Sequence, residues 1–192
     1  MKIGVLALQG AFREHCDMLE RCGTESIEVR KTEHLDDIQG LILPGGESTT
    51  IGILLEEWNL MDKVKERAAQ GMAIYGTCAG MILLAKNIIG SKQPRLGLMD
   101  VVVLRNAYGR QRESFEIDLN VPELGEDPVR AVFVRAPYIS SAESNVEVLA
   151  TVNDQIVVAR QGKILATAFH PEFTNDDRIH KYFIKIAQNL VS

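Results

Sequence analysis

Residues 72–80 read Met-Ala-Ile-Tyr-Gly-Thr-Cys-Ala-Gly, an apolar run followed by a glycine-flanked cysteine and then by a helix-forming run. The order strand, tight turn, helix is the setting of a nucleophile elbow in α/β proteins, here with Cys78 at the turn. Small residues at Gly76 and Gly80 allow the strand and the helix to pass close to each other. The segment therefore predicts an α/β fold with a nucleophile at the carboxyl end of a buried strand.

Strands and helices alternate on both sides of this segment. Short apolar runs that end near glycine or proline, the pattern of parallel strands buried on both faces, lie at residues 3–8, 41–43 and 73–75. Helical patterns cover residues 12–21, 49–55, 60–69 and 79–86. This alternation predicts a mostly parallel central sheet flanked by helices on both faces, with a site at the carboxyl ends of the strands.

The second half of the chain has a different pattern. Apolar runs follow one another with only turns between them, at residues 101–104, 115–119, 131–134, 146–152, 156–159 and 164–168. They predict added antiparallel strands. A last stripe at helical spacing, Ile179, Phe183, Ile186 and Leu190, predicts a C-terminal helix against the sheet. We expect residues 1–192 to form one domain.

Composition restricts the classes of partner. The chain has 192 residues, 46% of them hydrophobic, and a formal net charge of −5 with both signs mixed along the chain. No basic stripe could neutralise nucleic-acid phosphates or anionic lipid, and the apolar opening is too short for a membrane span or a signal peptide. Three cysteines without a C-x-x-C pair indicate neither disulfides nor zinc, and we expect a reducing cytoplasm.

Cys78 is the candidate nucleophile. An elbow residue has a strained backbone, and the unsatisfied N–H groups at the start of the following helix favour a negative charge on its sulfur. The alternative is a buried structural cysteine, which is common. Glycines at both required spacings favour the catalytic role. Cys16 and Cys22 lack this setting, and we assign them to helix packing or to the surface.

His170 is the candidate acid and base. It ends an apolar run in Phe169-His170-Pro171-Glu172, where Pro171 biases His170 toward an extended conformation. Residues two apart in an extended segment point the same way, so Glu172 could orient the His170 ring. The alternative, a solvated pair at a strand end, becomes weaker beside the elbow. The other histidines, His15, His34 and His180, are expected at the surface.

A glycine pair follows the strand at residues 41–43, in Pro44-Gly45-Gly46-Glu47-Ser48. It could be only a tight turn whose helix is capped by Ser48 or Thr49. In a fold with an elbow, however, a loop from a neighbouring strand supplies the second oxyanion donor. We therefore predict an oxyanion hole formed by the N–H groups of Gly46 and Ala79.

Together, the motifs G-T-C-A-G, P-G-G-E-S and F-H-P-E resemble those of the class I (triad) glutamine amidotransferases, in order and in rough spacing over most of the chain. Segments outside the triad are most similar to the glutaminase subunits of pyridoxal 5′-phosphate synthase: residues 8–15, Gly109-Arg110-Gln111, Ser114-Phe115-Glu116, and residues 132–137. The resemblance implies a flavodoxin-like fold.

The resemblance also implies a function. The chain would hydrolyse L-glutamine through Cys78, His170 and Glu172 and supply ammonia to a separate barrel-shaped synthase. Glutamine would be held by Gly46, Glu47, Ser48, Arg105, Val134 and Arg135, and an arginine suits its α-carboxylate. No cofactor or metal is expected, since pyridoxal phosphate is assembled on the partner. Nor do we expect a fused synthase domain, because the chain ends soon after its last predicted helix.

Other functions remain open. The chain could serve a synthase of histidine, purine or aminobenzoate biosynthesis, against which the segments outside the triad argue. A cysteine peptidase or stress-response protein of similar architecture is disfavoured by the C-terminal His-x-Glu pair and the glycine loop. A binding module with a decayed site is disfavoured because each expected catalytic residue is present.

Overall fold

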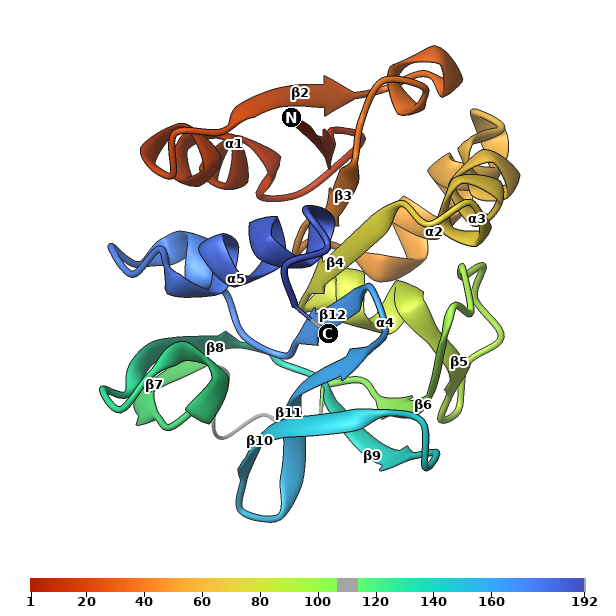
Figure 1. Cartoon of the computed structure of the whole chain (residues 1–192). Helices are drawn as coiled ribbons and strands as arrows, with labels where there is room; N and C mark the ends of the chain where they lie inside the picture. The colour runs from red at the N-terminus through yellow and green to blue at the C-terminus, as the bar shows by residue number, and fades with distance from the viewer. Residues whose placement is uncertain (107–113, 192) are drawn as a thin grey trace.

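The computed structural model describes residues 1–106 and 114–191, and its central sheet has ten strands (Figure 1). One half of the sheet consists of five neighbouring strands that all run parallel. In spatial order these are β2 (Glu25–Val29), β1 (Lys2–Leu6), β3 (Gly40–Leu43), β4 (Ala73–Thr77) and β12 (Ile164–Thr167). The predicted parallel sheet is confirmed.

The other half of the sheet is mostly antiparallel. It continues from β12 through β11 (Gln155–Gln161), β9 (Tyr138–Ala142), β6 (Met99–Leu104) and β5 (Ala85–Ile88), while β10 (Glu147–Val152) pairs with β11. A separate antiparallel pair is formed by β7 (Ser114–Leu119) and β8 (Val129–Val134). Single turns of 3₁₀ helix occupy Thr32–Leu35, Pro122–Leu124 and Pro171–Phe173.

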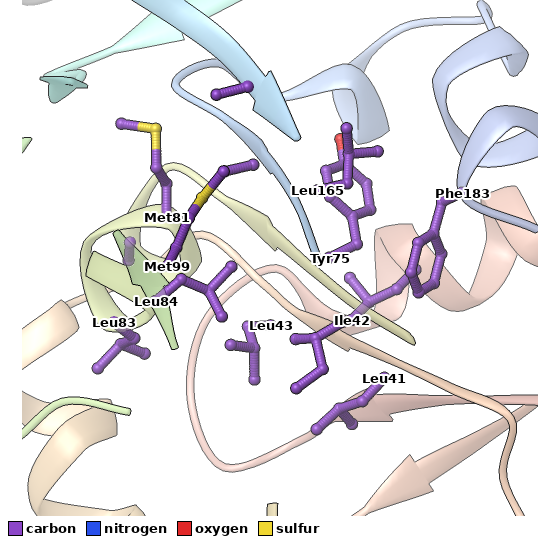
Figure 2. Close-up of a cluster of buried hydrophobic side chains, with 14 of the residues drawn as sticks. Leu41, Ile42, Leu43, Tyr75, Met81, Leu83, Leu84, Met99, Leu165 and Phe183 are labelled. Carbon is purple, nitrogen blue, oxygen red and sulfur yellow. The ribbon is translucent and has the colours of Figure 1, made fainter. Parts of the chain in front are cut away.

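Helices cover both faces of the parallel half. Figure 1 shows α1 (Phe12–Arg21) and α5 (Arg178–Ala187) on one side, and α2 (Ser48–Glu57), α3 (Leu60–Ala69) and α4 (Ala79–Leu84) on the other. Within the described ranges no helix is long and apolar enough to cross a membrane. Figure 2 shows the core between the layers, with Met81, Leu83 and Leu84 of α4 near Leu43, and Tyr75 near Phe183.

Several sequence predictions were wrong in detail. The helix predicted at residues 79–86 ends at Leu84, because Ala85–Ile88 extends and pairs with β6. The run at residues 164–168 was expected among antiparallel strands, yet β12 is parallel to β4 and antiparallel only to β11. Strands β2 and β9 were not predicted, because each contains charged or polar residues and is only partly buried.

Close backbone packing fixes helix α4 at the end of β4. A Cβ on Gly76 would lie 2.5 Å from the carbonyl carbon of Gly80, and a Cβ on Gly80 would collide with the carbonyl oxygen of Leu43 in β3. The glycines at the two elbow spacings are therefore required by the approach of the helix to both strands, as the sequence predicts.

The strand order places the crevice. The chain passes from β1 to β2 in one direction along the sheet and from β3 to β4 in the other, so the order reverses between β1 and β3. Ligands of open α/β sheets bind at such a reversal, beyond the carboxyl ends of the strands. The loops that follow β1, β3 and β4 meet there.

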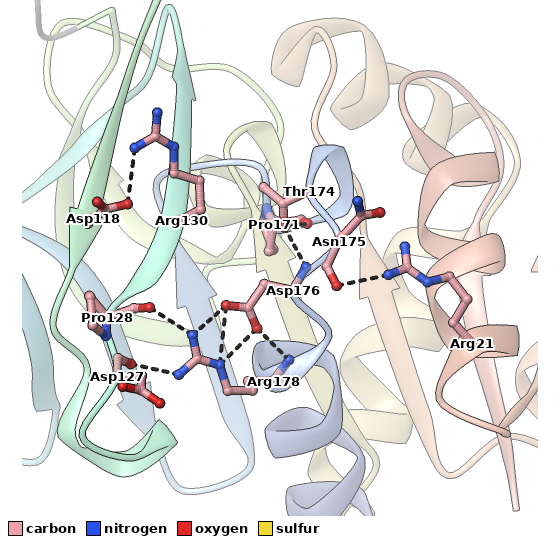
Figure 3. A network of polar contacts seen from close by, with 10 residues as sticks. All are labelled: Arg21, Asp118, Asp127, Pro128, Arg130, Pro171, Thr174, Asn175, Asp176 and Arg178. Atoms are coloured by element: carbon pink, nitrogen blue, oxygen red, sulfur yellow. Dashed lines mark hydrogen bonds and ion pairs between the residues drawn. The ribbon is translucent and has the colours of Figure 1, made fainter.

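Arg178 joins the start of α5 to the loop before β8 (Figure 3). Its guanidinium donates to the backbone carbonyls of Asp127 at 2.6 Å and Pro128 at 2.8 Å, and it pairs with Asp176 at 2.6 Å. Arg130, in the same view, donates to the exposed carboxylate of Asp118, and it also donates to that of Glu116. Arg178 thus satisfies backbone groups of a distant segment, whereas Arg130 forms surface pairs.

We predict that Arg178→Ala lowers the free energy of unfolding by about 1–2 kcal/mol, because two backbone carbonyls lose a charged donor. Arg130→Ala is the matched control and should cost less, since exposed ion pairs contribute little. Urea unfolding of both variants measures the difference. An equal loss in the two would contradict the role given to Arg178.

Candidate active site

A cleft of about 340 Å³ opens at the predicted edge of the sheet, beyond the carboxyl ends of β1, β3 and β4. It brings together nearly all the residues that the sequence singles out. Its lining includes Cys78, His170, Gly46, Ala79, Glu47, Ser48, Arg105, Val134 and Arg135, along with Gln9 and Phe173. Glu172 does not line the cleft and lies behind His170. Gly109-Arg110-Gln111 lies outside the described residues.

Cys78 stands at a strained turn between β4 and α4. Its φ of 48° and ψ of −101° place a non-glycine residue in a sparsely populated region, as an elbow requires. The side chain is 8% exposed, and Sγ lies 3.9 Å from the carbonyl oxygen of Val134. The sulfur therefore lies largely buried in the lining of the cleft.

His170 links the sulfur to a buried carboxylate. Its Nδ1 lies 2.7 Å from Glu172 Oε1, and its side chain is hydrogen-bonded with Cys78. Burial lowers the pKa of His170, but the hydrogen bonds and charges of Cys78 and Glu172 outweigh it and raise the pKa to about 10. The ring is therefore an imidazolium at neutral pH, which places a proton donor beside Cys78.

The contact between His170 and Glu172 forms by a different route from the one predicted. Glu172 lies in the 3₁₀ turn Pro171–Phe173, with His170 as its N-cap, and not in an extended segment. Burial acts to raise the pKa of Glu172, yet its electrostatic interaction with His15, followed by the hydrogen bond and charge of His170, holds the pKa below its ordinary value. Glu172 is thus ionised, as an orienting carboxylate must be.

The glycine loop after β3 packs directly on the His170 ring. A Cβ on Gly45 would collide with the ring's Cε1. The segment after β1 holds this loop on its other side. Ala11 N–H donates to Gly45 O at 3.0 Å, and Gln9 Oε1 accepts from Glu47 N–H at 2.8 Å. Gln9 was not predicted as a site residue, and its place in the cleft follows only from the β1–β3 crevice.

Arg105 is held in place by an amide that the sequence does not point to. Its Nη1 donates to Gln93 Oε1 at 2.8 Å, and the hydroxyls of Ser48 and Thr49 donate to the same oxygen at 3.2 Å. Gln93 thus ties Arg105 to the start of α2. No sequence pattern marks Gln93, because it lies in an irregular segment between β5 and β6.

Arg135 and Glu47 face each other at the rim of the cleft. Their side chains are 64% and 59% exposed, and Nη2 lies 3.4 Å from Oε1. Such an exposed pair contributes little to stability. Arg135 has a φ of 43°, so its backbone, like that of Cys78, is held in the left-handed region beside the cleft.

The expectation that His15 and His180 lie at the surface was wrong. Both are fully buried and hydrogen-bonded to each other, Nδ1 of His15 to Nε2 of His180 at 2.8 Å. A pattern that could have revealed them exists. His15 shares the helical phase of Met18 and Leu19, and His180 that of Phe183 and Ile184, all buried.

The remaining polar residues fit no metal centre. Among the described residues, no group of three or more His, Cys, Asp or Glu side chains could hold a metal ion. Cys16 and Cys22 are partly buried, are unpaired and lie outside the cleft. Burial raises the pKa of both thiols.

We predict that Cys78→Ser lowers the pKa of His170 from about 10, because the variant loses the sulfur that helps to hold the proton on the ring. Cys16→Ser is the control and should leave the His170 pKa unchanged. Titration of the imidazole by nitrogen–proton NMR measures both. A His170 pKa that is the same in Cys78→Ser and in the unmodified chain would refute the effect of Cys78 on the ring.

Comparisons with protein families, curated relatives and solved structures agree on the family of this chain. A model described as the SNO glutamine amidotransferase family matches residues 5–189. The pyridoxal 5′-phosphate synthase subunit PdxT of Pelotomaculum thermopropionicum is 63% identical over 185 residues, with 96% of this chain and 94% of the relative covered. Its namesake from Carboxydothermus hydrogenoformans is 60% identical, with 96% and 97% covered.

A solved structure described as a crystal structure of glutamine amidotransferase superposes with a TM-score of 0.93 at 53% identity. The match covers 97% of this chain and 98% of that one. These findings confirm the resemblance that the sequence motifs indicate. Because the family model and the relatives span nearly the whole sequence, the chain belongs to the SNO glutamine amidotransferase family.

Proposed function

We propose that the chain is a glutaminase subunit that hydrolyses L-glutamine to L-glutamate and ammonia for a partner that makes pyridoxal 5′-phosphate. The observation that carries the proposal is the chain of contacts from Cys78 through His170 to Glu172 at the floor of an open cleft. The names of the relatives at 60% and 63% identity support the choice of synthase.

In the first half of the reaction the Cys78 sulfur attacks the side-chain amide carbon of glutamine. The developing oxyanion accepts hydrogen bonds from the N–H groups of Gly46 and Ala79, which both line the cleft. His170 gives its proton to the amide nitrogen, the C–N bond breaks, and ammonia leaves. A γ-glutamyl thioester remains on Cys78.

In the second half water attacks the thioester carbon. His170, now neutral, takes a proton from the water, the C–S bond breaks, and glutamate is released. Glu172 keeps the ring oriented with Nδ1–H toward Oε1, so that Nε2 faces the reacting atoms. The proton taken from water stays on His170 for the next cycle.

Arg105 and Arg135 bind the α-carboxylate of glutamine in this proposal, assisted by the Gly46-Glu47-Ser48 loop and by Val134. Nη1 of Arg105 donates to Gln93 and Thr49. Because a guanidinium has five N–H donors, other donors of Arg105 remain for a carboxylate. The negative side chain of Glu47 on the opposite rim suits the substrate ammonium group.

The partner synthase would act through the segment at residues 9–15. This segment bonds Gly45 O through Ala11 and Glu47 N–H through Gln9. The peptide unit between Gly45 and Gly46 has no Cβ on either side and can flip at little steric cost. Docking at residues 9–15 would set which group of this unit, a carbonyl or an N–H, faces the oxyanion.

Two further parts of the proposal concern the chain as a whole. Residues 1–192 act as one glutaminase domain, supported by a hydrophobic core that joins both halves of the sheet. The protein works in a reducing cytoplasm, supported by three unpaired thiols.

We predict that Cys78→Ala abolishes glutamine hydrolysis, because no other thiol lines the cleft within the described residues. His170→Ala should be nearly as severe and Glu172→Ala milder. Ammonia release is measured in the presence of the synthase, with Cys16→Ala as the control. Turnover by folded Cys78→Ala would remove the central claim.

We predict that 6-diazo-5-oxo-norleucine, a glutamine analogue, alkylates Cys78 and spares Cys16 and Cys22. The label follows from binding in the cleft next to an activated sulfur. Peptide mass mapping locates it. Labelling mainly at Cys16 or Cys22 would contradict the assignment.

We predict that glutamine turnover rises at least about tenfold when the purified synthase is added, since one oxyanion donor is worth about 10²–10³ in rate. The comparison uses the chain with and without its partner. A free chain as fast as the complex would refute the gating while leaving the triad intact.

A further inference from the structure

Behind the catalytic face, a pair of histidines from two helices contacts the carboxylate that orients His170. His15 of α1 and His180 of α5 lie with ring centroids 5.1 Å apart and both are fully buried. The ring of Tyr75 meets both edge to face. The proposed reaction does not use these two histidines. Because both are buried, they are not surface residues either.

His15 reaches two residues of the site at once. Its Nε2 lies 3.1 Å from Thr77 Oγ1, on the residue just before Cys78, and 3.5 Å from Glu172 Oε1. That oxygen is the one that lies 2.7 Å from His170 Nδ1. Two imidazoles therefore face a single carboxylate oxygen, one from the cleft side and one from behind.

The carboxylate has few other partners. Glu172 Oε2 is buried and has no hydrogen-bond partner among the described residues. An ionised carboxylate buried in this way is costly unless donors or positive dipoles face it. An N–H group on His15 Nε2, hydrogen-bonded to Thr77 Oγ1 at 3.1 Å and lying 3.5 Å from Oε1, would turn the positive end of its dipole toward the carboxylate and supply such stabilisation.

Both His15 and His180 are neutral at neutral pH. Burial lowers the pKa of His15, aided by the charge of His170 and opposed by Glu172 and Glu14. Each neutral ring carries one N–H group, and the hydrogen bond between His15 and His180 uses one of these two N–H groups.

His180 decides on which nitrogen His15 carries its proton. Burial, followed by His15 and Arg21, holds the pKa of His180 well below its ordinary value. If His15 donated from Nδ1, its Nε2 lone pair would accept from the Thr77 hydroxyl and still lie beside the Glu172 carboxylate. His180 would then bury an Nδ1–H without a partner in the described chain. If His180 instead donates from Nε2, its buried Nδ1 carries only a lone pair. His180 Nε2–H thus donates to His15 Nδ1, and His15 keeps its proton on Nε2.

We propose that His15 is a positioning residue of the triad: its Nε2–H, fixed by the bond from His180, keeps Glu172 ionised and in place against His170. The proposal rests on the proposed glutaminase function and deepens it. It extends the chain of contacts from the cleft, through the carboxylate, to the interface between α1 and α5.

The first test compares His15→Leu with His15→Gln in the complex with the synthase. Leucine fills the site but has no donor, whereas the glutamine amide can place an N–H near the position of Nε2. We expect His15→Leu to lower kcat about 10- to 100-fold with KM within about twofold, and His15→Gln to recover most of the loss. Tyr75→Phe, which keeps the ring against both histidines, is the control and should retain kcat.

The second test needs no turnover. Carbon NMR of labelled glutamate carboxyls measures the pKa of Glu172 in the chain alone, and His15→Leu should raise it, because a positive dipole beside Oε1 is lost. If His15→Leu does not fold, His180→Leu replaces it and should shift the Glu172 pKa in the same direction.

The outcomes separate the two proposals. Unchanged kcat in folded His15→Leu, or a loss that glutamine does not restore together with an unshifted Glu172 pKa, would overturn the positioning role. If the unmodified complex releases no ammonia from glutamine, the proposed function fails. The Glu172 pKa then still decides whether His15 stabilises the carboxylate.

Discussion

The whole site depends on the close contact of helix α4 with the backbones of β3 and β4. Gly76 and Gly80 let the helix approach so closely that no side chain fits between Gly76 and Gly80 or between Gly80 and Leu43. All six residues of α4 are buried, so the helix is stabilised by packing rather than by its length. This packing offsets the strain of Cys78, of order 1–3 kcal/mol for such a backbone, and keeps the sulfur aimed into the cleft.

A second constraint is electrostatic. The site keeps one carboxylate ionised in the interior, with a charged imidazole on one side and a neutral one on the other. The two rings differ in charge because interactions with Cys78 and Glu172 raise the pKa of His170, whereas desolvation outweighs the effect of Glu172 and Glu14 on His15. Desolvation also lowers the pKa of His180.

Features with a local cause could be predicted from the sequence. The elbow at Cys78, the parallel strands and the helices at residues 12–21 and 60–69 depend on short patterns, and the structure has them. Features set by distant segments could not. The strand β12 reads like its antiparallel neighbours, and its parallel pairing with β4 depends on residues 90 positions apart along the chain, such as Thr77 and Thr167. Likewise, Gln93 and the His15–His180 pair acquire their roles only from partners on other elements.

The position of β12 in the middle of the sheet bears on the order in which the molecule can be built. Strand β4 pairs with β3 on one edge and with β12 on the other, and β12 is the last strand of the chain. During synthesis the edge of β4 that receives β12 stays open until residue 167 has emerged, and an apolar open edge invites pairing with other chains. The same delay withholds His170 and Glu172, which directly follow β12, so a nascent chain carries its nucleophile long before it can use it.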